Sequence, residues 1–152
     1  MVVFEELFIK SKGRPVEFNG EMVRMLDEIP VGNDVSVRVE FKLANSEWRQ
    51  GVSLTTEGSF EVGSQQIKRG IALWQDTAPR VVDVRVRSKS GTLQVKNIWD
   101  VGDGVVHSWH NGAAMIVDVD GETRRYRCND GYADADFDDL VFSLTFIEPR
   151  SS

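Results

Sequence analysis

Residues 35–43 read VSVRVEFKL, with an apolar side chain at every second position. Successive side chains of a β-strand point to opposite faces of a sheet, so this alternation predicts a half-buried strand. Arg38, Glu40 and Lys42 would then occupy the solvent-facing side of the strand. This stretch is typical of one strand in an antiparallel sheet that covers a core with one face.

The same alternation recurs on both sides of this stretch. Turn signals at Ser90-Gly91 and Asp120-Gly121 separate pairs of alternating segments and predict two hairpins, 81–87 with 92–98 and 115–119 with 123–128. A last strong strand is expected at 140–146. Weaker strands are expected at 2–9, 15–18, 51–55, 58–62 and 67–74.

Helical periodicity is scarce in the chain. Only residues 21–29 have the spacing of a short helix, with Met22, Leu26 and Ile29 on one side. Many short strands separated by frequent turns predict an all-β fold, an antiparallel β-sandwich or jelly roll with at most one short helix. The 152 residues show no break in composition, so we expect a single domain over 1–149 and a frayed end at 150–152.

The formal net charge is −6, from 18 basic and 24 acidic residues. This balance argues against nucleic acid as a partner, because nucleic-acid binding depends on clustered lysine and arginine. No apolar stretch is long enough to predict a membrane span. The lone Cys128 excludes an intramolecular disulfide and is expected to be an inert, half-buried residue.

The first ten residues, MVVFEELFIK, carry acids where a signal peptide would carry basic residues. The chain as written is therefore expected to be cytoplasmic, or extracellular if a leader has been removed.

Acidic residues are concentrated in one segment before the last expected strand. Residues 130–139 contain five aspartates and no basic residue. Ca²⁺ takes about six to eight oxygen ligands, and a bound cation would relieve the repulsion among these carboxylates. We therefore expect a Ca²⁺ site formed by Asp130, Asp134, Asp136, Asp138 and Asp139. Two alternatives remain, a merely solvated acidic loop and a loop that one of these aspartates fixes by accepting backbone hydrogen bonds.

The segment Asp134-Ala-Asp-Phe-Asp-Asp-Leu-Val-Phe142 resembles the D-x-D-F-[ND]-D-L-V-[FV] signature. This signature closes several bacterial β-sandwich domains of secreted or surface proteins associated with calcium and carbohydrate. The resemblance implies that the segment leads into the final core strand. It also implies that Asp134, Asp136 and Asp139 are the positions to which the roles of the signature's acidic residues carry over most readily. It is confined to this short part of the chain, and no family resemblance covers the first hundred residues.

A second unusual stretch, residues 97–112, combines two tryptophans, both histidines and two aspartates in a glycine-rich connection. Sugar sites commonly pair an aromatic ring with polar side chains that bind hydroxyl groups. The expected carbohydrate-binding residues are Trp99, Asp100, Asp103, Trp109 and Asn111. Alternatively, one or both tryptophans pack in the core. His107 and His110 would point to opposite sides of a strand, which disfavours a histidine metal site.

Common enzymatic motifs, including the nucleophile elbow, the Walker loop and the HExxH zinc motif, are absent from the sequence. The sequence therefore favours a non-catalytic β-sandwich recognition module that binds carbohydrate, with Ca²⁺ as an assisting cofactor. A structural or assembly protein is the first alternative, with a protein surface as partner. A jelly-roll hydrolase or lyase is the second. The sequence leaves the oligomeric state open.

Overall fold

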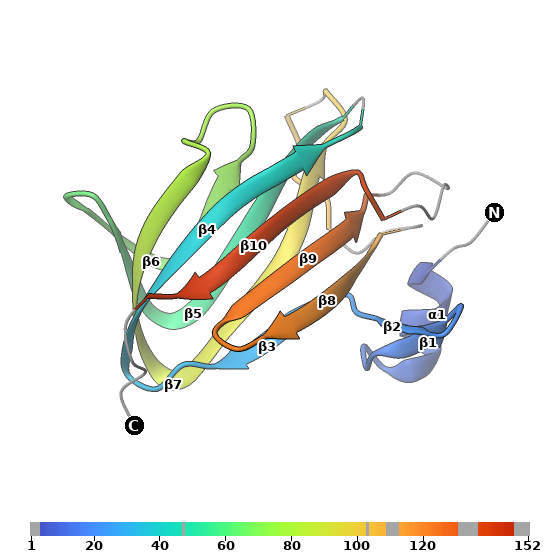
Figure 1. Ribbon diagram of the computed structural model, residues 1–152, viewed down its shortest axis with the longest axis horizontal. Coiled ribbons are helices and arrows are strands. Elements are labelled where there is room, and N and C mark those ends of the chain that lie inside the picture. The colour runs from blue at the N-terminus through green and yellow to red at the C-terminus, as the bar shows by residue number, and fades with distance from the viewer. Residues whose placement is uncertain (1–3, 47, 103, 109–112, 131–136, 148–152) are drawn as a thin grey trace.

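The computed structural model describes residues 4–46, 48–102, 104–108, 113–130 and 137–147. One helix precedes ten strands along the chain (Figure 1). In order, the elements are α1 (Phe4–Ser11), β1 (Val16–Phe18), β2 (Glu21–Val23), β3 (Asp27–Pro30), β4 (Asp34–Ala44), β5 (Arg49–Val62), β6 (Gln65–Trp74), β7 (Val81–Asp100), β8 (Ala114–Asp120), β9 (Thr123–Asn129) and β10 (Leu140–Phe146).

Eight of the strands form a single antiparallel sheet. Seven of them follow the order β6-β5-β7-β4-β10-β9-β8, and β3 pairs separately with β7. The strand quoted first in the sequence, β4, is interior and pairs with both β7 and β10. Its alternation therefore reflects one face on the core and one in solvent, rather than an open sheet edge.

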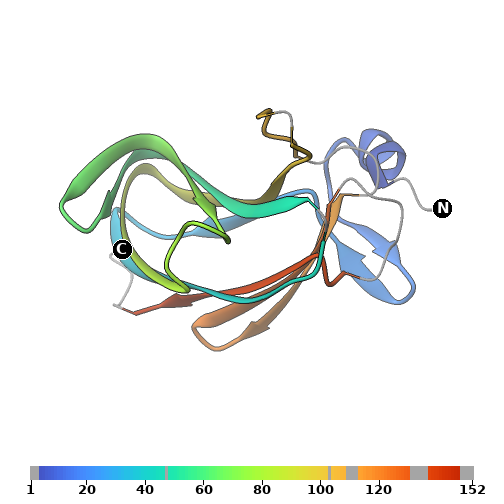
Figure 2. The same cartoon turned by 90° about the horizontal axis from the view of Figure 1, so that it is seen from above.

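The sheet folds over on itself into two layers, which Figure 2 shows from above. The first part of β7 pairs with β4 in one layer, at Val81–Arg87, and its later part pairs with β3 in the other, at Thr92–Val95. Strand β5 pairs with β7 through both parts, with a register irregularity between Thr56 and Gly58. The fold is thus an all-β antiparallel sandwich with one short helix, which confirms the predicted fold class.

The main core lies between the two layers. The apolar side of β4 contributes Val35, Val37, Val39 and Phe41, all at most 4% exposed. Leu54 and Leu93 of β5 and β7 belong to the same buried cluster. Burial of a side chain of this size is worth about 1.5–3 kcal/mol, so this contiguous cluster is the principal source of stability.

A second, smaller core forms where α1 and the β1–β2 hairpin pack beside the sandwich. Its centre is aromatic, with the rings of Phe4 and Phe18 at 4.9 Å and those of Phe4 and Phe137 at 5.7 Å. Glu5 and Glu6 lie in the first turn of α1 and favour its helix dipole. None of the described helices is long and apolar enough to cross a membrane.

Three of the expected elements are wrong. The segment 2–9, expected as a strand, contains most of α1, because Phe4 and Phe8 share one helix face and are both buried. The segment 21–29, expected as a helix, contains β2 and the start of β3. The expected hairpin around Ser90-Gly91 is part of the continuous strand β7. Gly91, at φ +77°, bends β7 without reversing it, so both parts remain paired with β5.

The other strong predictions are confirmed. The hairpin around Asp120-Gly121 forms as β8 and β9, and the last strand is β10. The expected strands 51–55 and 58–62 are joined in β5. The single-domain boundaries remain a prediction.

Candidate functional site

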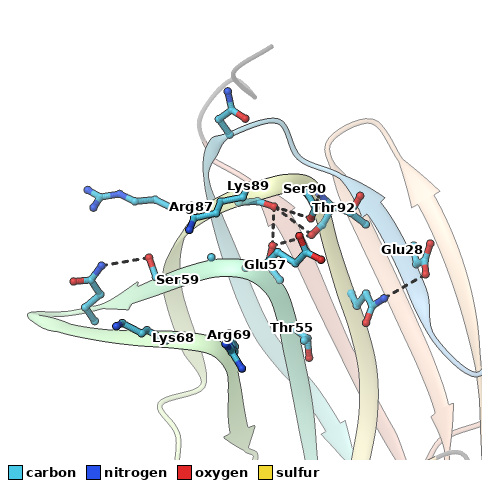
Figure 3. Close-up of a pocket in the computed structure, with 16 residues that line it drawn as sticks. Glu28, Thr55, Glu57, Ser59, Lys68, Arg69, Arg87, Lys89, Ser90 and Thr92 are labelled. Atoms are coloured by element: carbon cyan, nitrogen blue, oxygen red, sulfur yellow. Dashed lines mark hydrogen bonds between the residues drawn. The ribbon is translucent and has the colours of Figure 1, made fainter.

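An open groove of about 1290 Å³ lies over the bend of the sheet (Figure 3). Its lining comes from β3, β5, β6, β7 and the connection after β3. The groove is therefore built on paired strands, which hold its side chains more firmly than a loop would.

A close approach of two backbones shapes the base of the groove. A Cβ atom added to Gly58 of β5 would lie 1.9 Å from the carbonyl oxygen of Arg87 on β7. Only glycine allows this separation, which is one of the established uses of glycine within a strand. The backbones of β5 at Gly58 and β7 at Arg87 are consequently in direct contact.

Hydroxyl groups complete the base of the groove. The buried Thr56 Oγ1 lies 2.8 Å from both Ser88 Oγ and the Thr92 carbonyl oxygen. The backbone N–H of Gly91 donates to Ser88 Oγ at 3.0 Å. Because these polar groups are satisfied within the protein, they hold the bend in one conformation.

The wall of the groove is polar. Hydroxyl and amide side chains line it at Asn33, Thr55, Ser59, Gln66, Ser90, Thr92 and Gln94. Charged side chains line it at Glu28, Glu57, Lys68, Arg69, Arg87 and Lys89. Some amides are already oriented, since Gln94 Nε2 donates to Glu28 Oε1 and Gln66 Nε2 to Ser59 Oγ, both at 3.3 Å. The described lining contains no aromatic, histidine or cysteine side chain.

The expected sugar platform at Trp99 is not formed. Trp99 is 2% exposed, and its ring stacks on that of His107 with the ring centres 6.1 Å apart. The backbones of the two residues exchange hydrogen bonds of 3.1 and 2.9 Å. Trp99 thus takes the core role that the sequence left open as its alternative.

Of the remaining residues of that expected sugar site, the structure describes only Asp100. Asp100 Oδ1 accepts hydrogen bonds from the backbone of Gly102 at 2.8 Å and Gly104 at 3.2 Å, and so stabilises a turn. Asp103, Trp109 and Asn111, together with His110, lie outside the described residues.

The described part of the acidic segment is organised by hydrogen bonds. Asp130 is fully buried, and its Oδ2 accepts from Ser46 Oγ at 2.6 Å and Gln50 Nε2 at 2.9 Å. Asp139 Oδ2 accepts from the backbone N–H of Asp130 at 3.0 Å. Asp138 Oδ2 accepts from Asn45 Nδ2 at 3.1 Å. These contacts match the alternative in which aspartates fix the loop.

The described residues do not by themselves fit a calcium ion. They contain no group of three or more His, Cys, Asp or Glu side chains positioned to hold a metal. Gln50 Oε1 and Asp138 Oδ1 are buried oxygens without a hydrogen-bond partner among the described residues. Asp134 and Asp136 lie outside the described residues, so the Ca²⁺ site remains a prediction.

Two buried ionisable groups on β9 serve the core rather than a site. The Tyr126 hydroxyl donates to Asp27 Oδ2 at 2.7 Å, and Arg124 Nη1 lies 3.3 Å from the same oxygen. Burial, followed by the nearby Asp27 carboxylate, raises the pKa of Tyr126 well above its usual value. Cys128 is completely buried, and this burial raises the pKa of its thiol, which disfavours the reactive thiolate.

Comparison with known protein families, characterised proteins and solved structures gave no significant match to this chain. The candidate site therefore rests on geometry alone. Sequence reasoning missed the groove because its residues are scattered between positions 28 and 94. The sequence did offer one signal for the groove, namely two short basic segments, Lys68-Arg69 and Arg87-Ser88-Lys89. The strand order β6-β5-β7 places these segments on either side of β5.

Proposed function

We propose that this protein is a non-catalytic recognition module that binds a carbohydrate in the groove over the sheet bend. The observation that carries the proposal is the groove itself, about 1290 Å³ in volume and lined by polar side chains from four strands. An oligosaccharide presents many hydroxyl groups, each of which donates and accepts hydrogen bonds, and the polar side chains of this lining can serve both roles.

The lining can address both roles of a sugar hydroxyl. Thr55 and Ser59 can donate or accept, Gln66 and Gln94 carry both kinds of group, and Glu57 accepts only. The buried hydrogen bonds of Thr56 and Ser88 hold the groove in shape before a ligand arrives, which lowers the entropic cost of binding. The proposal transfers sugar recognition from the buried Trp99 to this groove.

The chemistry of the lining favours binding over catalysis. Glycoside hydrolysis ordinarily requires two carboxyl groups acting together on one bond. The two glutamates of the groove lie on different strands, and Glu28 of β3 already accepts a hydrogen bond from the Gln94 amide of β7, whereas Glu57 belongs to β5. No described lining side chain is a histidine or cysteine that could act as a base or nucleophile.

The test is a titration of the isotope-labelled protein with a panel of neutral and acidic oligosaccharides, followed by nuclear magnetic resonance. Binding should shift the amide signals of Thr55, Gln66 and Gln94 together. Thr55→Val should weaken the affinity, because it removes a hydroxyl while keeping the side-chain shape. Thr145→Val is the matched control, since Thr145 lies on β10 and does not line the groove.

Two results would contradict the proposal. One is that no member of the panel shifts the groove signals, and the other is that the shifts centre on residues away from the groove. Release of reducing sugar during the titration would instead indicate a hydrolase.

A further inference from the structure

The groove carries the opposite charge to the protein as a whole. The chain has a formal net charge of −6. Within the groove, however, the four cations Lys68, Arg69, Arg87 and Lys89 outnumber the two anions Glu28 and Glu57. A concave surface of one sign attracts ligands of the other sign and raises their local concentration.

These cations are placed on both sides of the bend. Lys68 and Arg69 belong to β6, whereas Arg87 and Lys89 belong to β7, and β5 runs between the two strands. Figure 3 shows Arg87 and Lys89 on one side of Glu57 and Ser59, and Lys68 and Arg69 on the other. A chain-like ligand lying along β5 would therefore have cations on both flanks and hydroxyl groups beneath it.

Three of the four groove cations differ from the arginines beside the groove, because their side chains lack close partners among the described residues. Outside the groove, Arg38 pairs with Asp83 and Arg85 with Asp34, each at 2.7 Å. Within the described chain, the side chains of Lys68, Arg69 and Lys89 make no hydrogen bond or ion pair. The fourth cation, Arg87, has its Nη2 atom 3.8 Å from Glu61 Oε2. Arg38 and Arg85 are already neutralised by their partners, whereas Lys68, Arg69 and Lys89 keep their charge for a ligand.

The backbone of Arg69 supports the same interpretation. Arg69 has φ +71°, a left-handed conformation that is strained for a residue other than glycine. In the register of β6 with β5, Arg69 lies between Lys68, which pairs with Ser59, and Gly70, which pairs with Thr55. The strained conformation thus occurs where β6 follows the bend, at a residue that lines the groove.

We propose that the ligand of the groove is an acidic carbohydrate, whose carboxylate or sulfate groups lie between the cations of β6 and those of β7. This inference rests on the proposed function and adds the charge of the ligand to it. A single-stranded nucleic acid fits less well, because the described lining offers no aromatic ring for base stacking.

The experiment is isothermal titration calorimetry of the full chain at low ionic strength with three oligosaccharides of equal length. Hexagalacturonate carries carboxylates, a heparin-derived hexasaccharide carries mainly sulfates, and maltohexaose is neutral. We expect at least one acidic probe to bind more tightly than maltohexaose, and its affinity to fall as salt is added. The preferred acidic probe distinguishes carboxylate from sulfate recognition.

A charge-matched pair of variants locates the effect. The double variant Lys68→Gln/Lys89→Gln should weaken binding of the acidic probe by roughly tenfold and leave maltohexaose binding nearly unchanged. The control Lys10→Gln/Lys12→Gln changes the net charge equally at exposed positions at the end of α1. The control should bind like the unaltered protein.

The outcomes separate the two proposals. Binding of maltohexaose in the groove as tightly as the acidic probes would overturn the acidic preference while keeping carbohydrate recognition. Failure of every oligosaccharide to bind would overturn both proposals. Equal losses in the two double variants would show a general charge effect and contradict the assigned residues, and tighter binding of hexathymidylate would indicate a nucleic-acid site instead.

Discussion

Replacing Gly58 by alanine should destabilise the fold more than an ordinary glycine replacement. The added Cβ would lie 1.9 Å from the Arg87 carbonyl oxygen and 2.9 Å from its carbon, and Cβ atoms essentially never approach other atoms within 3.0 Å. The two strands must therefore separate by about 1 Å in a region where interiors are close-packed. The clash is with backbone atoms, which a change of side-chain rotamer cannot relieve.

The magnitude follows from the cost of inserting atoms into a packed site, which is about 1–3 kcal/mol and occasionally more. Since the obstruction is backbone, we expect about 3 kcal/mol for Gly58→Ala. For a domain of this length, about 1 kcal/mol corresponds to a change in melting temperature of about 2–4 °C, so Tm should fall by about 6–12 °C. Calorimetry and urea unfolding both measure this loss.

Two other glycines provide a graded control. The Cβ of Gly51→Ala would meet the Leu73 carbonyl oxygen and the Trp74 ring at 2.9 Å, so an intermediate loss is expected. The Cβ of Gly70→Ala would find its nearest atom, the Leu54 carbonyl oxygen, at an ordinary 3.5 Å, and Tm should change little. If the Gly58 variant melted as close to the unaltered protein as the Gly70 variant does, the close approach of β5 and β7 would be refuted.

Three further predictions address the buried network and the acidic segment. Tyr126→Phe should lower the free energy of unfolding by about 1.5–3 kcal/mol, because the buried Asp27 loses a donor; an unchanged urea midpoint would contradict this. Because burial raises the pKa of both Tyr126 and Cys128, the folded state binds these protons more tightly than the unfolded state. The stability that these two groups contribute should therefore be fully present below the ordinary thiol and phenol pKa values. The free energy of unfolding should fall as pH rises above about 9, and this fall should be smaller in Tyr126→Phe. If the acidic segment binds Ca²⁺, a concentration of about a hundred times Kd should add about 2.7 kcal/mol and raise Tm relative to chelator. Asp136→Ala should remove that increase, and identical melting curves with Ca²⁺ and chelator would reject the site.

Local alternation predicted the strands that have one face in solvent and one on the core. Val35, Val37 and Val39 follow this rule on β4, and Val82, Val84 and Val86 follow it on β7. The rule failed at Phe4 and Phe8, where apolar residues in a short segment were taken for a strand although their spacing of four suits a helix. The short segment 21–29 failed for the opposite reason, since helical spacing was found in residues that pair as strands, β2 with the adjacent β1 and β3 with the distant β7.

The candidate site was much less predictable than the fold. A groove made by Lys68, Arg87 and Gln94 depends on how bends in three long strands coincide, and no local pattern encodes that coincidence. The Ser90-Gly91 signal was wrongly interpreted as a hairpin turn, because a hairpin and a bend within one strand share that signal. Trp99 was singled out by composition, which cannot distinguish a ring that binds a ligand from one that packs inside the protein.

The shared strand β7 has a mechanical consequence. Since its first part pairs in one layer and its later part in the other, the two layers are not separate sheets that can peel apart. Pulling β3 away from Leu93 and Val95 would transmit tension along the same backbone to the pairing with β4. Amide hydrogen exchange should therefore report one opening free energy for the two parts of β7. Cutting the chain between these two parts would destabilise both layers of the sandwich rather than one.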